Sequence, residues 1–110
     1  MVKNSINKIL LLGKIVRGPH KDPDRRDTDH LCFVLMTSEN RLKDDRPFVH
    51  EEHHQIEVSP SMLPPGTELQ EGTVVYLEGK IRTRCRTDDG GVKRYQTSVI
   101  AHSVELLTVS

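Results

Sequence analysis

The sequence contains no tryptophan, and its phenylalanines and tyrosines together make up only 4% of 110 residues. It has just two cysteines, Cys32 and Cys85, which lie far apart and lack the CxxC spacing of a thiolate metal site. A disulfide-stapled fold is therefore excluded, a reducing compartment is indicated, and we expect both cysteines to be buried. The hydrophobic fraction of 35% is low for a self-sufficient domain, which indicates that a second subunit covers part of the apolar surface.

Long apolar runs and an excess of either charge are also missing. No segment approaches the roughly 20 apolar residues of a membrane span, and residues 1–8 do not have the pattern of a secretory signal, so we expect a cytoplasmic or nucleoid-associated protein without membrane contact. Sixteen basic residues balance sixteen acidic ones. Any affinity for a polyanion must therefore come from local clustering of charge.

The length fits one domain, residues 1–110, and the pattern of apolar residues predicts strands. Extended patterns cover residues 6–16, 30–37, 51–58, 73–87 and 92–107, and the last two form a long hairpin around an Asp-Asp-Gly-Gly turn. We expect a bend or bulge at Gly13, a charged loop over 18–29, a polar protruding connection over 38–48, and a proline-rich connector over 59–72 with at most a turn of helix. Five strands predict an all-β fold, a five-stranded OB-fold barrel with little or no helix, rather than a sandwich.

Basic side chains alternate with neutral ones along the predicted fourth strand. The cations are Lys80, Arg82, Arg84 and Arg86, and Lys93 and Arg94 follow the turn. Because side chains of a strand alternate between its faces, the first four cations share one face. Residues 80–94 hold six basic and two acidic side chains, a local excess of +4 in a neutral chain. Cations about 7 Å apart suit the phosphates of an extended single strand, although a solvated outer face is the simpler alternative.

Three segments resemble the bacterial single-stranded DNA-binding protein family. The segment TVVYLEGKIRTRCRTDDGGVKRYQTSVIA is similar to the last hairpin of that family, INKILLLGKIVRGP to its opening, and FVLMTSE to its second strand. The similarity runs from Ile6 to about Leu107. It implies an OB-fold homotetramer or homodimer that coats exposed single-stranded DNA in replication, recombination or repair, with little sequence specificity. It also implies that Ile9 and Leu11 of the first strand pair the subunits and that His54 lies near their interface.

The sequence departs from this family at the positions that stack on bases. Arg41, His53 and Arg86 stand where the family usually has tryptophan, and Ser59 where it often has phenylalanine. Base stacking contributes about 1 to 3 kcal/mol per base, so its loss predicts weaker binding unless other side chains replace it. We predict that Arg41 contacts phosphate and that His53 and Phe48 contact bases.

Two further departures concern the connector and the C-terminal region. Prolines over 59–72 replace the helix that follows the third strand in the family, and the 110 residues include no Gly/Pro-rich linker with an acidic tip. Both features are similar to the primosomal replication protein N branch of the same fold. Members of that branch are dimers that bind single strands and helicase-loading proteins.

The histidines and carboxylates between residues 50 and 57 do not form a recognisable reaction centre. His50 and His54 share a face of the predicted strand but lie about 13 Å apart, too far to bind one ion. Neither a nucleophile nor a phosphate-binding loop accompanies Glu51, Glu52 and Glu57. The sequence therefore predicts no metal, no cofactor and no enzymatic activity.

Two functional hypotheses follow. In the first, the protein coats single-stranded DNA through its basic hairpin. The alternative is an OB-fold interaction module, a primosome-like accessory or divergent paralogue, that meets replication or repair proteins and has weak or lost strand binding. The basic hairpin favours the first hypothesis, and the missing aromatics and balanced charge favour the second. Only the first predicts an affinity for DNA that falls steeply with salt.

Overall fold

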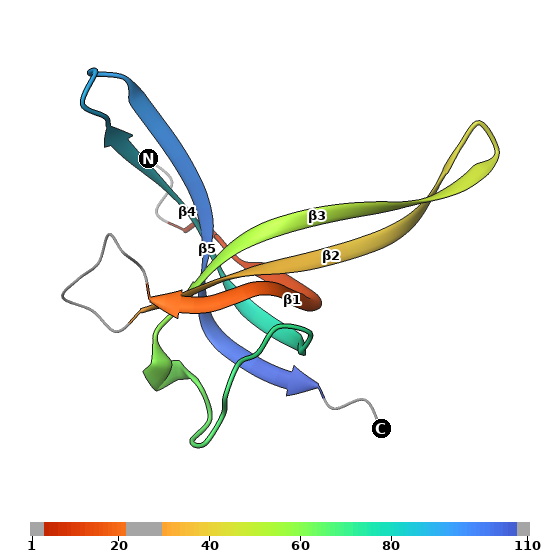
Figure 1. Ribbon diagram of the computed structural model, residues 1–110, viewed down its shortest axis with the longest axis horizontal. Helices are drawn as coiled ribbons and strands as arrows, with labels where there is room; N and C mark the ends of the chain where they lie inside the picture. Colours follow the sequence, from red (N-terminus) through yellow and green to blue (C-terminus); the bar gives the residue numbers. More distant parts are fainter. Residues whose placement is uncertain (1–3, 22–29, 108–110) are drawn as a thin grey trace.

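The computed structural model describes residues 4–21 and 30–107, which form a closed barrel of five strands (Figure 1). The strands are β1 (Ile9–Lys21), β2 (Leu31–Lys43), β3 (Arg46–Val58), β4 (Val74–Thr87) and β5 (Lys93–Leu107), and a 3₁₀ turn, η1 (Pro60–Met62), follows β3. Around the barrel the order is β1-β2-β3-β5-β4, with β4 closing on β1. All neighbours are antiparallel except β3 and β5. The prediction of an all-β, five-stranded OB-fold barrel with little helix is confirmed.

Alternate side chains of every strand fill the barrel. The fully buried ones are aliphatic or aromatic and come from all but β5: Ile15, Phe33, Leu35, Ile56, Val58, Val75 and Leu77. Val99, Ala101 and Val104 of β5 complete the same cluster. Burial of apolar area at roughly 25 cal/mol per Å² makes this cluster the main source of stability. Among the described residues, no helix is long and apolar enough to cross a membrane.

Two long hairpins extend beyond the barrel and point in different directions (Figure 1). β2 and β3 stay paired from Leu31 and Val58 to Lys43 and Arg46, and β4 and β5 stay paired up to Thr87 and Lys93. The two hairpins pair with each other through β3 and β5 over three residue pairs, 56–58 with 99–101. Beyond those pairs the arms separate, and we call the space between them the fork.

The structure corrects two loop predictions. Residues 18–21, expected in a loop, belong to β1 and pair with β2, while residues 22–29 lie outside the described part of the chain. Residues 38–48, expected as an irregular connection, form the outer half of the β2–β3 hairpin. Asp44 and Asp45 make its turn with φ of 52° and 63°. Aspartate tolerates the left-handed conformation of such a two-residue turn, so the turn needs no glycine and gave no obvious signal in the sequence.

Two other expectations were wrong in detail. Gly13 does not lie at a bulge, since its pairing with Val75 is regular and the shifts in register come after Ile15. Instead, a Cβ at Gly13 would overlap the carbonyl oxygen of Met36, so glycine allows a close approach of β1 to β2. Cys85 is exposed and Cys32 half-buried, because Cys85 lies on the part of β4 that extends past the core.

Candidate nucleic-acid interface

The predicted basic residues of β4 alternate with the positions that continue the core side of the strand. Arg94 lies opposite Arg86 and so joins the same face, whereas Lys93 lies opposite Thr87 and belongs to the other one. We call the shared surface the cationic face. It consists of Lys80, Arg82, Arg84, Arg86 and Arg94, all exposed apart from the half-buried Arg84. The structure therefore brings together five of the six predicted cations of this hairpin.

One cation of this face is held by a buried carboxylate. An Nη2 atom of Arg84 lies 3.1 Å from Oε1 of Glu57 in β3, and Oγ of Ser98 in β5 donates a hydrogen bond of 3.1 Å to Oε2 of the same carboxylate. Glu57 is 5% exposed. This contact could not be predicted from local sequence patterns, because Glu57 and Arg84 come together where β3 and β5 pair.

The turn between β4 and β5 is organised by Asp88. Its Oδ1 accepts hydrogen bonds from the backbone N–H groups of Gly90 and Val92, at 3.0 and 2.9 Å, and its Oδ2 lies 3.1 Å from Nε of Arg94. The hydrogen bond from the Val92 N–H, aided by the Arg94 contact, lowers the pKa of Asp88 below its usual value. Part of the Arg94 charge is thus balanced within the hairpin.

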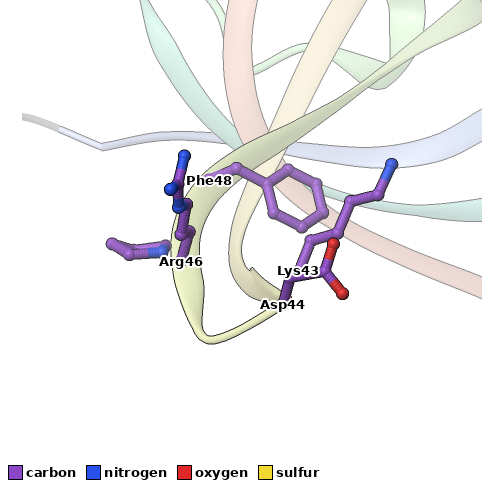
Figure 2. Close-up of a pocket in the computed structure, with 5 residues that line it drawn as sticks. Lys43, Asp44, Arg46 and Phe48 are labelled. Carbon is purple, nitrogen blue, oxygen red and sulfur yellow. The ribbon is translucent and has the colours of Figure 1, made fainter.

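The other hairpin places the predicted aromatic near its tip. Arg41 and Phe48 are direct cross-strand neighbours, and Nε of Arg41 donates to Glu39. Phe48 is 39% exposed and lines a hollow with Lys43, Asp44, Arg46 and Pro47 (Figure 2). A partly exposed ring beside cationic side chains can take one face of an unstacked base while the cations meet its phosphates. The structure therefore brings Phe48 and Arg41 together, but far from the cationic face.

The three histidines of β3 have different surroundings. Nε2 of His50 lies 2.6 Å from Oε1 of Glu52, and this hydrogen bond is the main cause that lowers the pKa of Glu52. Nε2 of His54 lies 2.9 Å from Oγ1 of Thr37. His53, on the opposite face of the strand, is exposed. Within residues 4–21 and 30–107, no group of three or more His, Cys, Asp or Glu side chains is arranged to hold a metal ion.

A pocket of about 280 Å³ lies at the base of the fork and is called the fork pocket. Its lining comes from both arms and from β1: Ile9, His53, His54, Gln55, Ile81, Thr97, Ser98 and Val99. Ile81 is 46% exposed, although it follows the buried Leu77 and Gly79 on β4. Apolar side chains therefore meet hydrogen-bonding groups in the pocket. Of these lining residues, the sequence predicted a base contact for His53 and an interface position for Ile9 and His54. The others were not predicted, because the lining forms where strands distant in the sequence converge.

Tyr95 is an exposed aromatic residue that is not among the predicted site residues. It lies opposite Cys85 in the β4–β5 hairpin and is 69% exposed, whereas Phe33 is fully buried in the core. Tyr95 therefore offers a second ring for base contacts, and its exposure distinguishes it from a core residue.

The residues predicted to pair subunits lie on the inner side of β1. Ile9 and Leu11 are partly buried and pack against the core. Because side chains alternate between the faces of a strand, both residues lie on the same inward face as the buried Ile15. Their neighbours Leu10 and Leu12 are 53% and 56% exposed. The exposed apolar surface of β1 is therefore centred on Leu10 and Leu12 rather than on the predicted pair.

The barrel, its two projecting hairpins and the cationic face define an OB-fold protein with the surface of a polyanion binder. Residues 6–107 match the model of the single-strand binding protein family, and the chain belongs to that family. The resemblance read from the three sequence motifs is thereby confirmed. The family is one of non-catalytic DNA-binding proteins.

Solved structures agree on the fold. A single-stranded DNA-binding protein of Plasmodium falciparum, in complex with single-stranded DNA, gives a TM-score of 0.75 at 22% identity, covering 98% of this chain and 100% of its own. The small single-stranded DNA-binding protein of Streptomyces coelicolor gives 0.65 at 15% identity, covering 90% and 92%. The dimeric N-terminal domain of PriB from Thermoanaerobacter tencongensis gives 0.67 at 18% identity, covering 94% and 98%. The chain is thus similar to both branches that the motifs indicated.

Proposed function

We propose that this protein binds single-stranded DNA in the fork region of its barrel, as a non-catalytic coat with little sequence specificity. The observation that supports the proposal best is the cationic face on a hairpin that projects from an OB-fold barrel of the single-strand binding protein family. Phosphates would follow the exposed cations Lys80, Arg82 and Arg86. A row of cations at about 7 Å intervals is suited to a polyanion that is extended rather than helical.

Bases would be held by surfaces that replace tryptophan. The fork pocket offers the apolar side chain of Ile81 together with the hydrogen-bonding groups of His53 and Gln55. The hollow beside Phe48 offers a ring at the far end of the other hairpin. These surfaces have no common donor pattern that would select one base, which supports the expectation of weak sequence preference.

A second copy would complete the assembly. The exposed Leu10 and Leu12 on β1, and the dimeric PriB domain among the similar structures, support a homodimer or homotetramer. The proposal also includes His54 as a residue near the subunit interface. Roles in replication, recombination or repair, contacts with proteins of those processes, and a cytoplasmic, nucleoid-associated location belong to the same proposal.

The test is a fluorescence-anisotropy titration of labelled oligo-dT at several salt concentrations. The test variant replaces Lys80, Arg82 and Arg86 by Gln, and the matched control replaces Lys14, Arg17 and Lys21, which are exposed on β1, by Gln. Both variants lose the same charge. For single strands the slope of log affinity against log salt is about −0.7 for each phosphate contact, so only the test variant should bind more weakly and with a shallower slope.

The same titration separates the two functional hypotheses. An interaction module would show no saturable binding even at about 50 mM salt, where the electrostatic term is strong. The tip of the β2–β3 hairpin makes that hypothesis concrete, because Leu42 and Val49 are 74% and 59% exposed there. Equal loss of affinity in the test and control variants would also overturn the proposed path, because it would show that only net charge matters.

A further inference from the structure

Glu57 is a buried carboxylate that links three strands at the base of the basic hairpin. It belongs to β3, lies beside Ile100 of β5 where the two hairpins pair, and is the cross-strand partner of Cys32 in β2. Its two oxygens contact Arg84 of β4 and Ser98 of β5, each at 3.1 Å. Nothing in the family resemblance or in the prediction of a cation row assigns a role to this residue.

The burial of this carboxylate decides how strongly it holds its partner. A carboxylate that is only 5% exposed has lost most of its hydration, so it needs a cation and a hydrogen-bond donor nearby. Arg84 supplies the first and Ser98 the second. The side chain of Arg84 is 32% exposed, and removing it would leave an uncompensated buried charge. Drawing Arg84 toward a phosphate would have the same cost.

We propose that Glu57 is a positioning residue that holds Arg84 at the junction of β3 and β5 and so withdraws it from the cations that contact phosphate. This inference rests on the proposed function. It corrects the expectation that every cation of the row binds the DNA backbone, and it changes the path of the strand. Arg82 and Arg86 lie about 13 Å apart along β4, so phosphate contacts fall into two groups with the Arg84–Glu57 pair between them.

The group nearer the barrel consists of Lys80 and Arg82, and the group nearer the turn consists of Arg86 and Arg94. The group of Lys80 and Arg82 lies at the base of the hairpin. There Ser98 is the cross-strand partner of Arg82 and also lines the fork pocket.

The experiment compares salt slopes for oligo-dT across wild type and three variants. Arg82→Gln removes an exposed cation that, within the described residues, has no carboxylate at ion-pair distance. The double variant Glu57→Gln with Arg84→Gln removes the pair without changing net charge. Glu57→Gln alone keeps a side chain that accepts from Ser98 and releases Arg84. Thermal melting of each variant confirms that it is folded.

We expect Arg82→Gln to make the slope shallower by about 0.7, the double variant to leave it unchanged, and Glu57→Gln to make it steeper by about 0.7. Between 50 and 200 mM salt, a slope change of 0.7 alters the loss of affinity about 2.6-fold. A merely structural role for Glu57 would change melting but not the slope.

The inference is overturned if the double variant loses as much slope as Arg82→Gln, because Arg84 would then be a phosphate contact. If Glu57→Gln does not fold, the double variant and Arg82→Gln still decide the matter. Failure of the proposed function looks different, because the wild-type protein itself would then show no salt-dependent binding.

Discussion

Replacing Phe48 by Ala tests whether the hairpin tip supplies a base contact that the absent tryptophans cannot. Stacking of a base on an aromatic ring contributes about 1 to 3 kcal/mol. Phe48 is 39% exposed and lines a hollow at the hairpin tip, so only part of its surface is open to a base. We therefore expect a loss near the lower end, about 1 to 2 kcal/mol, or roughly 5- to 30-fold in affinity.

The assay is the oligo-dT titration at constant salt, with Val49→Ala as the control. Val49 is the next residue of β3, is 59% exposed and points to the other face of the hairpin. Stacking releases no counterions, so Phe48→Ala should weaken binding without changing the salt slope. Phe48→Trp should strengthen binding, and its fluorescence should be quenched by the strand. Losses of equal size in Phe48→Ala and Val49→Ala would refute the reasoning.

Three other predictions concern stability and assembly. A Cβ at Gly79 would overlap the Ile100 carbonyl oxygen and lie 3.0 Å from the Ala101 Cα. Gly79→Ala should therefore lower the free energy of unfolding measured by chemical denaturation by about 1 to 3 kcal/mol. The control Gly90→Ala should leave it unchanged, because a Cβ there would meet only a side-chain atom at 3.5 Å. Replacing Leu10 and Leu12 by Glu should reduce the oligomer mass measured by light scattering, and an unchanged mass would place the interface elsewhere. The pKa of Asp88 is lowered in the folded protein, so its contribution to stability is present above the ordinary value of 3.8 and is lost as pH falls through the folded value. Asp88→Asn should remove that part of the acid sensitivity in melts between neutral and acidic pH, and an acid response identical to wild type would contradict this role for the turn.

Local patterns in the sequence were sufficient for the barrel and for the face that a cation occupies. The five strands and the long last hairpin follow from alternation and from the Asp-Asp-Gly-Gly turn, which are properties of neighbouring residues. The same alternation placed Lys80, Arg82, Arg84 and Arg86 on one face. It did not show that the β2–β3 hairpin continues to Lys43, because an Asp-Asp turn resembles a charged loop.

Only the tertiary structure decided which of these side chains are available and what they surround. Ile9 and Leu11 could not be separated from Leu10 and Leu12 without knowing which side of β1 faces the core. The fork pocket and the Arg84–Glu57 contact join residues that are distant in sequence, at the place where β3 and β5 run parallel. Strand patterns repeat every two residues and carry no information about the neighbour across a non-local pairing. The sequence by itself therefore determined an OB-fold protein with a basic hairpin, and the closure of the barrel determined that Arg84 meets a buried carboxylate while Lys80 and Arg82 stay exposed.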